Sequence, residues 1–373
     1  MPSRSVTLTQ ELVRLPSLNP PGEEAACIAY LSNLLAAAGI AVETYAFAPG
    51  RPSIVARIPG TGSDAPLCFT GHVDVVPLGS EPWTVAPFGG DIVDGKLFGR
   101  GSSDMKAGVA AFVAATLAEL AVQPGFRRGI TLVITAGEET GCEGAFHLAR
   151  SRKLGPAAFL VVAEPSSNLP IIAHKGSVRV AVRVRGRTAH SSMPELGENA
   201  IDRAVDMIRR LRSWRSDLPD HPLLGNMTAA VTTISGGLNI NSVPDQATFT
   251  VDIRTLPSQD HSGLVAEIRA LCGPEADVDV LTDFRGFETE PHHAAVMSLI
   301  DILHAHLDKR PPPLGAPYFT DASALVPGFG GVPTVVIGPG EAAQAHQTNE
   351  FCFVQNIEMS CSIYRAMIRQ MCR

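Results

Sequence analysis

The run Ile130–Thr135 (ITLVIT) is apolar or β-branched at every position, and this pattern limits the fold more than any other in the chain. A strand without alternating polar side chains must be covered on both faces, which is typical of a sheet packed between helices. Ala158–Ala163 and Thr334–Ile337 repeat the pattern, and we expect Thr334–Ile337 to rejoin the same sheet. Glu23–Ala38 and Met105–Leu120 predict helices. This alternation predicts a layered α/β domain.

The middle of the chain differs, because its predicted strands are apolar on one face only. In Ser177–Arg185 the valines alternate with polar residues, which is typical of an antiparallel sheet with one wet face. The elements from here to residue 288 follow the order β-α-β-β-α-β, the ferredoxin-like arrangement. We therefore expect residues 176–288 to form a small domain inserted into a larger one made of residues 1–175 and 289–373.

Charge and cysteine content exclude several classes of protein. The 373 residues include 30 Lys and Arg against 37 Asp and Glu, a formal net charge of −7, with no basic block, so we expect no nucleic-acid partner. The seven cysteines are scattered without a C-x-x-C pair, which disfavours disulfides and a thiolate zinc site. No apolar signal core or membrane-spanning run is visible, so we expect a cytoplasmic protein without membrane contact.

Polar side chains follow apolar runs at five places along the chain. They are His72 with Asp74, Asp104, Glu138 with Glu139, Glu164, and His346. Because open α/β sheets present their sites at strand ends, we expect the five places to converge. Each alone has an ordinary structural explanation, such as a strand-end histidine, a helix-capping aspartate or a solvated acidic turn.

Together these residues indicate metal chemistry. Two imidazoles and three carboxylates, without a thiolate, suit two divalent ions. Two ions about 3.5–4 Å apart need a bridging carboxylate, and Asp104, Glu139 and Glu164 are the candidates. One further carboxylate must act as general base. Asp74, two residues after His72 on the same face of an extended segment, can orient the histidine ring.

Seven short motifs carry a family resemblance. They are GHVDVVP, RGSSDMKAG, GEET, AEPS, GRTAHSSMP, NSVPDQ and AHQTNE, in this order from residue 71 to residue 350. The chain resembles the acetylornithine deacetylase, succinyl-diaminopimelate desuccinylase, aminoacylase and glutamate carboxypeptidase family of co-catalytic zinc enzymes. The resemblance implies a zinc-peptidase-like catalytic domain, with a mixed central sheet flanked by helices, and a ferredoxin-like lid that often forms the dimer contact.

The resemblance also implies a role for each residue of the centre. His72 and Glu164 would hold one Zn²⁺, Glu139 and His346 would hold the other, and Asp104 would bridge both. The Asp104–Met105 peptide bond would be cis. Glu138 would be the general base, and Asp74 would support His72. Co²⁺ and Mn²⁺ are possible substitutes for zinc.

Four residues outside the centre are implied in catalysis or substrate binding. By the resemblance, His190 would polarise the scissile carbonyl in the site of the other subunit, and Asn241 and Arg254 would bind the substrate. A guanidinium suits a carboxylate because it makes two parallel hydrogen bonds. Thr320 lies in a loop similar to a substrate-facing one. The structural alternatives are a surface-loop histidine, a strand-end surface arginine and, for the neighbouring Asp321, a helix cap.

The implied activity is metal-dependent hydrolysis of the amide bond of an N-acyl amino acid, similar to acetylornithine deacetylase. A dipeptidase or carboxypeptidase with the same metals is the nearest alternative, and an inactive scaffold of the family is a further one. A Cys-His hydrolase has no supporting arrangement, so we expect cysteine replacement to leave the chemistry intact. The expected ligands are a small N-acyl amino acid or short peptide, and the expected assembly is a homodimer through the lid.

Overall fold

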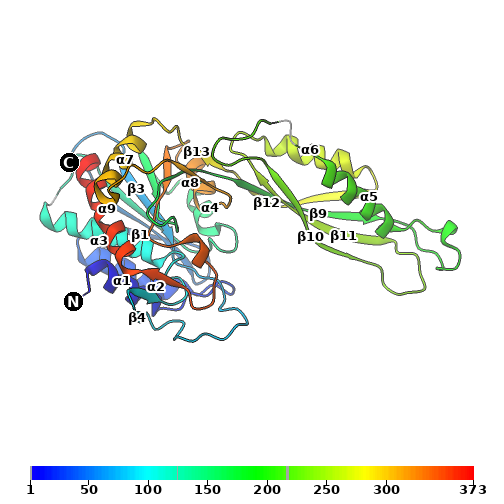
Figure 1. Ribbon diagram of the computed structural model, residues 1–373, viewed down its shortest axis with the longest axis horizontal. Coiled ribbons are helices and arrows are strands. Elements are labelled where there is room, and N and C mark those ends of the chain that lie inside the picture. The colour runs from blue at the N-terminus through cyan, green and yellow to red at the C-terminus, as the bar shows by residue number, and fades with distance from the viewer. Residues whose placement is uncertain (1, 124, 216–217) are drawn as a thin grey trace. The chain divides into compact units, whose positions relative to one another are not determined.

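The computed structural model describes residues 2–123, 125–215 and 218–373 and divides the chain into two units (Figure 1). The first unit comprises Met1–Ile172, Glu288–Gly315 and Thr320–Arg373, and the second comprises Ala173–Phe287 and Ala316–Phe319. Every helix in the described ranges is too short or too polar to cross a membrane.

The helices and strands have the following bounds. The helices are α1 (Arg4–Val13), α2 (Ala25–Ala37), α3 (Lys106–Val122), α4 (Glu143–Arg150), α5 (Ala200–Ser213), α6 (His261–Cys272), α7 (Ala294–Leu307), α8 (Ala322–Gly328) and α9 (Val354–Cys372). The strands are β1 (Ala41–Ala48), β2 (Arg51–Ile58), β3 (Leu67–His72), β4 (Ile92–Val93), β5 (Lys96–Phe98), β6 (Ile130–Thr135), β7 (Phe159–Val162), β8 (Ile171–His174), β9 (Gly176–Arg185), β10 (Thr228–Gly236), β11 (Gln246–Thr255), β12 (Ala276–Phe284), β13 (Phe287–Glu288), β14 (Leu314–Ala316), β15 (Thr334–Val336) and β16 (Phe351–Phe353).

The larger sheet is mixed and has the strand order β1-β2-β6-β3-β7-β15-β8-β13, with β14 paired to β8. Its central strands β6, β3, β7 and β15 run parallel to one another. Every residue of these four strands is buried, as the apolar runs predict for β6, β7 and β15. The pairing of β15 with β7 confirms that the late strand rejoins the first sheet.

Helices pack against this sheet in two groups. α3 contacts β3, α1 and α9, while α2 and α4 contact β1 and β2. A Cβ atom at Gly108 in α3 would lie only 2.1 Å from the carbonyl oxygen of Ala163, so the contact requires glycine. This close approach holds the start of α3, just after Asp104, against the end of β7, just before Glu164.

The second unit contains a four-stranded antiparallel sheet with the order β10-β11-β9-β12. The helices α5 and α6 fall between its strands along the chain, which confirms the ferredoxin-like arrangement. The valines of β9 are buried in its core, and Arg183 and Arg185 are exposed, as the alternation predicts. Asn199 and Asp260 cap α5 and α6 by accepting backbone N–H groups with their side chains.

Candidate metal centre

The polar side chains predicted at strand ends lie at one edge of the larger sheet. His72 is the last residue of β3, Glu138 and Glu139 follow β6, and Glu164 follows β7. These three strands are parallel neighbours, and β15 extends the parallel set before the loop that carries His346. Strands that run in one direction therefore deliver their terminal side chains to one place.

Two groups of candidate ligands form at this edge. In the first, Nε2 of His72 lies 3.2 Å from Oδ1 of Asp104 and 3.6 Å from Oε1 of Glu164. In the second, Nε2 of His346 lies 3.0 Å from Oε2 of Glu139 and 3.6 Å from Oδ2 of Asp104. Asp104 thus offers one oxygen to each group. The geometry favours Asp104 as the bridge among the three carboxylates left open by the sequence.

The carboxylates of Glu138, Glu139 and Glu164 are buried close to one another. Burial raises the pKa of Glu138 and of Glu164 well above the ordinary value, and neighbouring carboxylates add to the effect. Burial, followed by the charge of Asp104, also raises the pKa of Glu139. Such mutual repulsion is relieved by nearby cations. The centre therefore fits two divalent ions, since imidazole nitrogen and carboxylate oxygen are donors that zinc, cobalt and manganese accept.

The two histidines differ in their surroundings. Burial opposes protonation of His72, but the charge of Glu164 and hydrogen bonds to Asp104 and Asp74 raise its pKa well above the usual value. His346 is about half exposed, and its hydrogen bond to Glu139 raises its pKa. A histidine must be neutral to ligate a metal, so cations would compete with protons at both rings.

Glu138 belongs to neither ligand group, although it is buried beside them. Its oxygen Oε1 accepts a weak hydrogen bond from the Cys142 thiol, with a sulfur–oxygen distance of 3.8 Å. Its backbone N–H donates to Oδ1 of Asp74 over 3.2 Å. Of the two glutamates in the GEET motif, Glu139 belongs to a ligand group and Glu138 does not. A general base must keep its carboxylate free to accept a proton, and Glu138 meets this requirement.

Asp74 lies beside the His72 ring, as its spacing predicts, and it also contacts the acidic turn after β6. The Nδ1 atom of His72 lies 2.9 Å from the backbone oxygen of Asp74 and 3.5 Å from its carboxylate. The carboxylate also accepts hydrogen bonds from the backbone N–H of Glu139 at 3.0 Å and from the side-chain amide of Asn19 at 2.8 Å. Asp74 therefore supports both His72 and the acidic turn after β6. Asn19 was not among the predicted site residues, because no motif marks it and it lies in a loop distant along the chain.

The two aspartates that were candidate helix caps do not cap. α3 starts without a side-chain hydrogen bond at its N-terminus, and the Asp104 carboxylate faces the histidines. Asp321 stands at the N-terminus of α8, but its carboxylate accepts a hydrogen bond from the Thr135 hydroxyl. Thr320 is buried, and its hydroxyl oxygen accepts the N–H of Ala322 at 3.1 Å. The Asp104–Met105 bond is cis, as the resemblance implies.

The other predicted residues lie in the second unit. His190 is exposed, and its Nδ1 lies 2.8 Å from the Ser192 hydroxyl. The segments of His190 and Asn241 are adjacent, because the N–H of Ser191 donates to the backbone oxygen of Asn241 over 3.0 Å. Arg254, near the end of β11, pairs with Asp252 at 2.8 Å.

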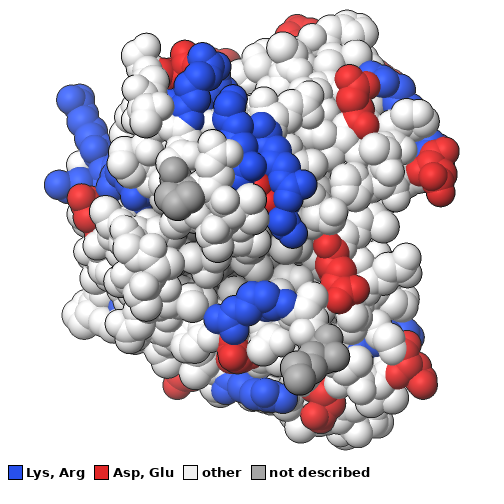
Figure 2. Space-filling model, turned by 90° about the vertical axis from the view of Figure 1, so that its left-hand side faces the viewer, with Lys and Arg blue, Asp and Glu red and all other residues white. Residues whose placement is uncertain are grey.

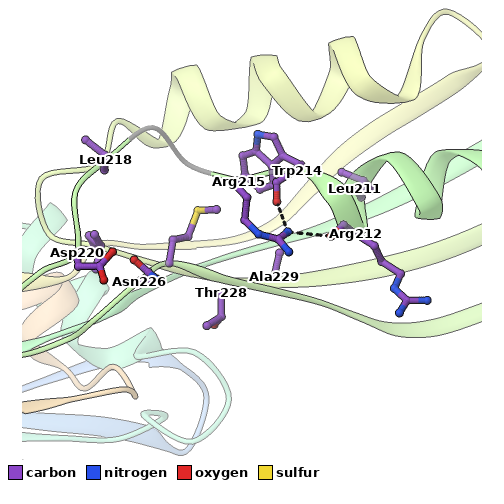
Figure 3. Close-up of a pocket in the computed structure, with 11 residues that line it drawn as sticks. Leu211, Arg212, Trp214, Arg215, Leu218, Asp220, Asn226, Thr228 and Ala229 are labelled. Atoms are coloured by element: carbon purple, nitrogen blue, oxygen red, sulfur yellow. Dashed lines mark hydrogen bonds between the residues drawn. The ribbon is translucent and has the colours of Figure 1, made fainter.

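The second unit also has a cavity of about 550 Å³ between the end of α5 and the start of β10 (Figure 3). Trp214, Arg215 and Met227 contribute to its lining. The Arg215 guanidinium donates to the backbone oxygens of Arg212 and Trp214 at 2.8 and 2.7 Å, so it is engaged locally. The residues that line this cavity include no predicted site residue.

Comparisons with known proteins bear on this site. The sequence model of peptidase family M20/M25/M40 matches residues 68–370. A protein of Staphylococcus aureus strain Mu50 named probable succinyl-diaminopimelate desuccinylase is 31% identical, covering 90% of this chain and 91% of its own length. The succinyl-diaminopimelate desuccinylase of Parvibaculum lavamentivorans is also 31% identical, covering 99% of this chain and 95% of its own.

A solved structure shares the fold. The M20 family metallo-carboxypeptidase Sso-CP2 of Sulfolobus solfataricus superposes with a TM-score of 0.82 at 17% identity, covering 98% of this chain and 99% of that one. The mixed sheet with its inserted ferredoxin-like unit is therefore a known architecture.

Proposed function

The chain belongs to peptidase family M20/M25/M40, and we propose that it hydrolyses the amide bond of a small N-acyl amino acid with the help of bound metal ions. The observation that carries this proposal is the pair of ligand groups that share Asp104, with the buried Glu138 beside them. The names of the two relatives support an N-succinyl amino acid as the first substrate to test.

We propose that His72 and Glu164 hold one Zn²⁺, that Glu139 and His346 hold the other, and that Asp104 bridges them. Zinc would lower the pKa of water towards about 7 and would polarise the substrate carbonyl. Co²⁺ and Mn²⁺ are proposed substitutes, since they accept the same donors. Asp74 would keep His72 and the turn of Glu138 and Glu139 in place through the contacts described above.

Glu138 would act as the general base and then as the general acid. Its carboxylate would accept a proton from the attacking water and would deliver that proton to the leaving amine. One oxygen, Oε1, is engaged by the Cys142 thiol, so the other oxygen, Oε2, would carry the proton. His190 would donate a hydrogen bond to the oxygen of the carbonyl group as negative charge develops there.

Substrate binding is proposed for the residues of the second unit. Asn241 and Arg254 would bind the carbonyl and carboxylate groups of the substrate. For Arg254 this requires the guanidinium to share its donors between Asp252 and the substrate. Contact of Thr320 with substrate stays a prediction, as do a homodimer through the second unit and a cytoplasmic location.

The test is a substrate panel with the zinc-loaded chain. N-succinyl and N-acetyl amino acids and dipeptides are incubated with the protein, and the released amine is measured. We expect hydrolysis of an N-acyl amino acid to be the fastest reaction. Faster hydrolysis of dipeptides would replace this proposal with a peptidase. An inactive scaffold would hydrolyse nothing and would bind no zinc when zinc is supplied.

A further inference from the structure

Glu350 is a fully buried carboxylate that belongs to neither ligand group. It directly precedes β16, which pairs antiparallel with β5, so that Phe351 lies opposite Phe98. The backbone continues this pairing, because the N–H of Gly99 donates to the carbonyl oxygen of Glu350 over 2.9 Å. The ladder thus sets Glu350 beside the loop that leads from β5 to Asp104.

The Glu350 carboxylate accepts four hydrogen bonds from that loop. Oε1 accepts the backbone N–H of Ser103 at 2.7 Å and of Asp104 itself at 3.0 Å. Oε2 accepts the N–H of Gly101 at 3.0 Å and Nη1 of Arg100 at 2.8 Å. One buried side chain therefore binds three backbone N–H groups in the segment that ends at the shared ligand.

Arg100 extends this contact to the other ligand loops. Its Nη1 donates to the backbone oxygen of Gln347 at 3.1 Å, and its Nη2 donates to those of His346 at 3.4 Å and Pro77 at 3.2 Å. Pro77 lies five residues after His72. The guanidinium, which is also buried, therefore joins the segments of His72, Asp104 and His346.

We propose that Arg100 and Glu350 are positioning residues that preset the shared ligand Asp104 and the ligand His346 for two cations. This inference rests on the proposed function, because the ligands are those assigned there. A buried ion pair contributes little net stability once its desolvation is counted, so stability alone does not account for it. Ligands that are already held in the binding geometry lose less conformational entropy when the metal binds. The metal affinity is therefore higher.

The variant Glu350→Gln tests the proposal without changing the size of the side chain. The amide NH₂ group must face either the Ser103 and Asp104 N–H groups or the Gly101 N–H and Arg100, so two donors lose their acceptor in either orientation. Affinity for Zn²⁺ and Co²⁺ is measured by titration of the metal-free chain in competition with a chelator. We expect both cations to bind about 10- to 100-fold more weakly than in the wild type.

Glu119→Gln is the matched control. Glu119 is also fully buried, and it pairs with three arginines of the C-terminal segment, Arg365, Arg369 and Arg373. Basic side chains gather on the face shown in Figure 2, which is the side of Figure 1 where the C-terminus lies. We expect this variant to lose stability and to keep wild-type metal affinity, because Glu119 contacts no ligand loop.

The measured affinities separate the positioning role from its alternatives. Wild-type affinity in Glu350→Gln, or an equal loss in Glu119→Gln, would overturn the positioning role. If Glu350→Gln does not fold, Arg100→Lys serves instead, because lysine keeps the charge but cannot reach the three backbone oxygens together; wild-type affinity in that variant would overturn the role as well. Absence of cation binding by the wild-type chain would refute the metal centre of the proposed function itself.

Discussion

His72 in the first unit is a proposed metal ligand, and His190 in the second unit is a proposed hydrogen-bond donor to the substrate. The surroundings of the two rings differ. His72 ends a central strand, is buried, and has Asp104, Glu164 and the backbone of Asp74 around its ring. His190 lies in an exposed loop, where its ring contacts Ser192. The first environment suits a group that must not move, and the second suits a group that meets its target only during turnover.

Variants of the two units should therefore have different defects. Loss of a residue in the first unit should disturb the cations or the reacting water, and it should do so even without substrate. Loss of a residue in the second unit should leave the centre intact and should appear only in turnover. The following predictions test this separation, beginning with the largest effect.

Glu138→Gln should lower kcat about 10²- to 10⁴-fold, because the amide cannot accept the proton of the attacking water. Both cations should stay bound, since Glu138 is in neither ligand group. Steady-state kinetics and metal analysis of the purified variant check both statements. Near-normal turnover would contradict the assigned role.

Glu143→Gln is the control for this variant. Glu143 is the first residue of α4, directly after the turn that carries Glu138, but its carboxylate pairs with Arg51 at 3.2 Å and is partly exposed. Its replacement should leave kcat close to the wild-type value, because it removes no group from the centre. A comparable loss in both variants would indicate that the turn as a whole has been disturbed.

His190→Ala should lower kcat about 10²- to 10³-fold, the usual cost of removing one donor to a developing oxyanion. It should retain both cations, whereas His346→Ala should lose the cation that it shares with Glu139 and Asp104. Metal analysis of the two variants side by side tests the separation directly. Loss of metal from His190→Ala would show that this histidine is a ligand.

The centre was predictable from sequence because parallel strands convert separation along the chain into proximity. His72 and His346 are far apart in sequence, but the apolar runs before Glu139 and Glu164 show which strand ends meet. The strand β1 was not predicted, because all of its residues are exposed or half-buried and Glu43 and Thr44 interrupt its apolar positions. The partnership of Arg100 with Glu350 was not predictable either, since it depends on the pairing of the three-residue strands β5 and β16.

The contacts of Asp74 show a second limit of sequence patterns. A spacing of two residues correctly places Asp74 beside His72, but it cannot say whether the backbone oxygen or the carboxylate meets the ring. The choice depends on the N–H groups of Glu138 and Glu139, which attract the carboxylate and come from another strand end. Spacing therefore predicts which segments face each other, and local competition for hydrogen bonds decides the atoms.

The second unit should also be the source of a specific acid sensitivity. His174 is fully buried, with its ring edge-on to Phe287, and burial lowers its pKa from 6.5 to about 4. Between these pH values the unfolded chain binds a proton that the folded chain does not, so stability falls as the pH drops from about 6.5 towards about 4. From pH 7 to pH 5 this histidine should cost about 2 kcal/mol of unfolding free energy.

Urea unfolding at pH 7 and pH 5 measures this effect in the wild type and in His174→Phe. The variant should lose less stability between the two pH values than the wild type does, whatever its stability at pH 7. The control is His304→Phe, which replaces an exposed histidine of α7 and should leave the pH dependence unchanged. Identical pH dependence in His174→Phe and the wild type would show that the ring is protonated in the folded chain.

The smallest effect concerns the cysteines, which were expected to be dispensable for the chemistry. Six of them should follow that expectation, but the Cys142 thiol donates to Oε1 of Glu138. Cys142→Ala should lower kcat about 3- to 10-fold with KM unchanged, the cost of one weak hydrogen bond to the general base. Cysteine and alanine experience the same backbone strain at this position, where φ is 54°, so the comparison isolates the thiol. Cys68→Ala, which empties an equally buried site on β3, should keep wild-type kcat. A similar loss in both variants would mean that packing, rather than the thiol, controls Glu138.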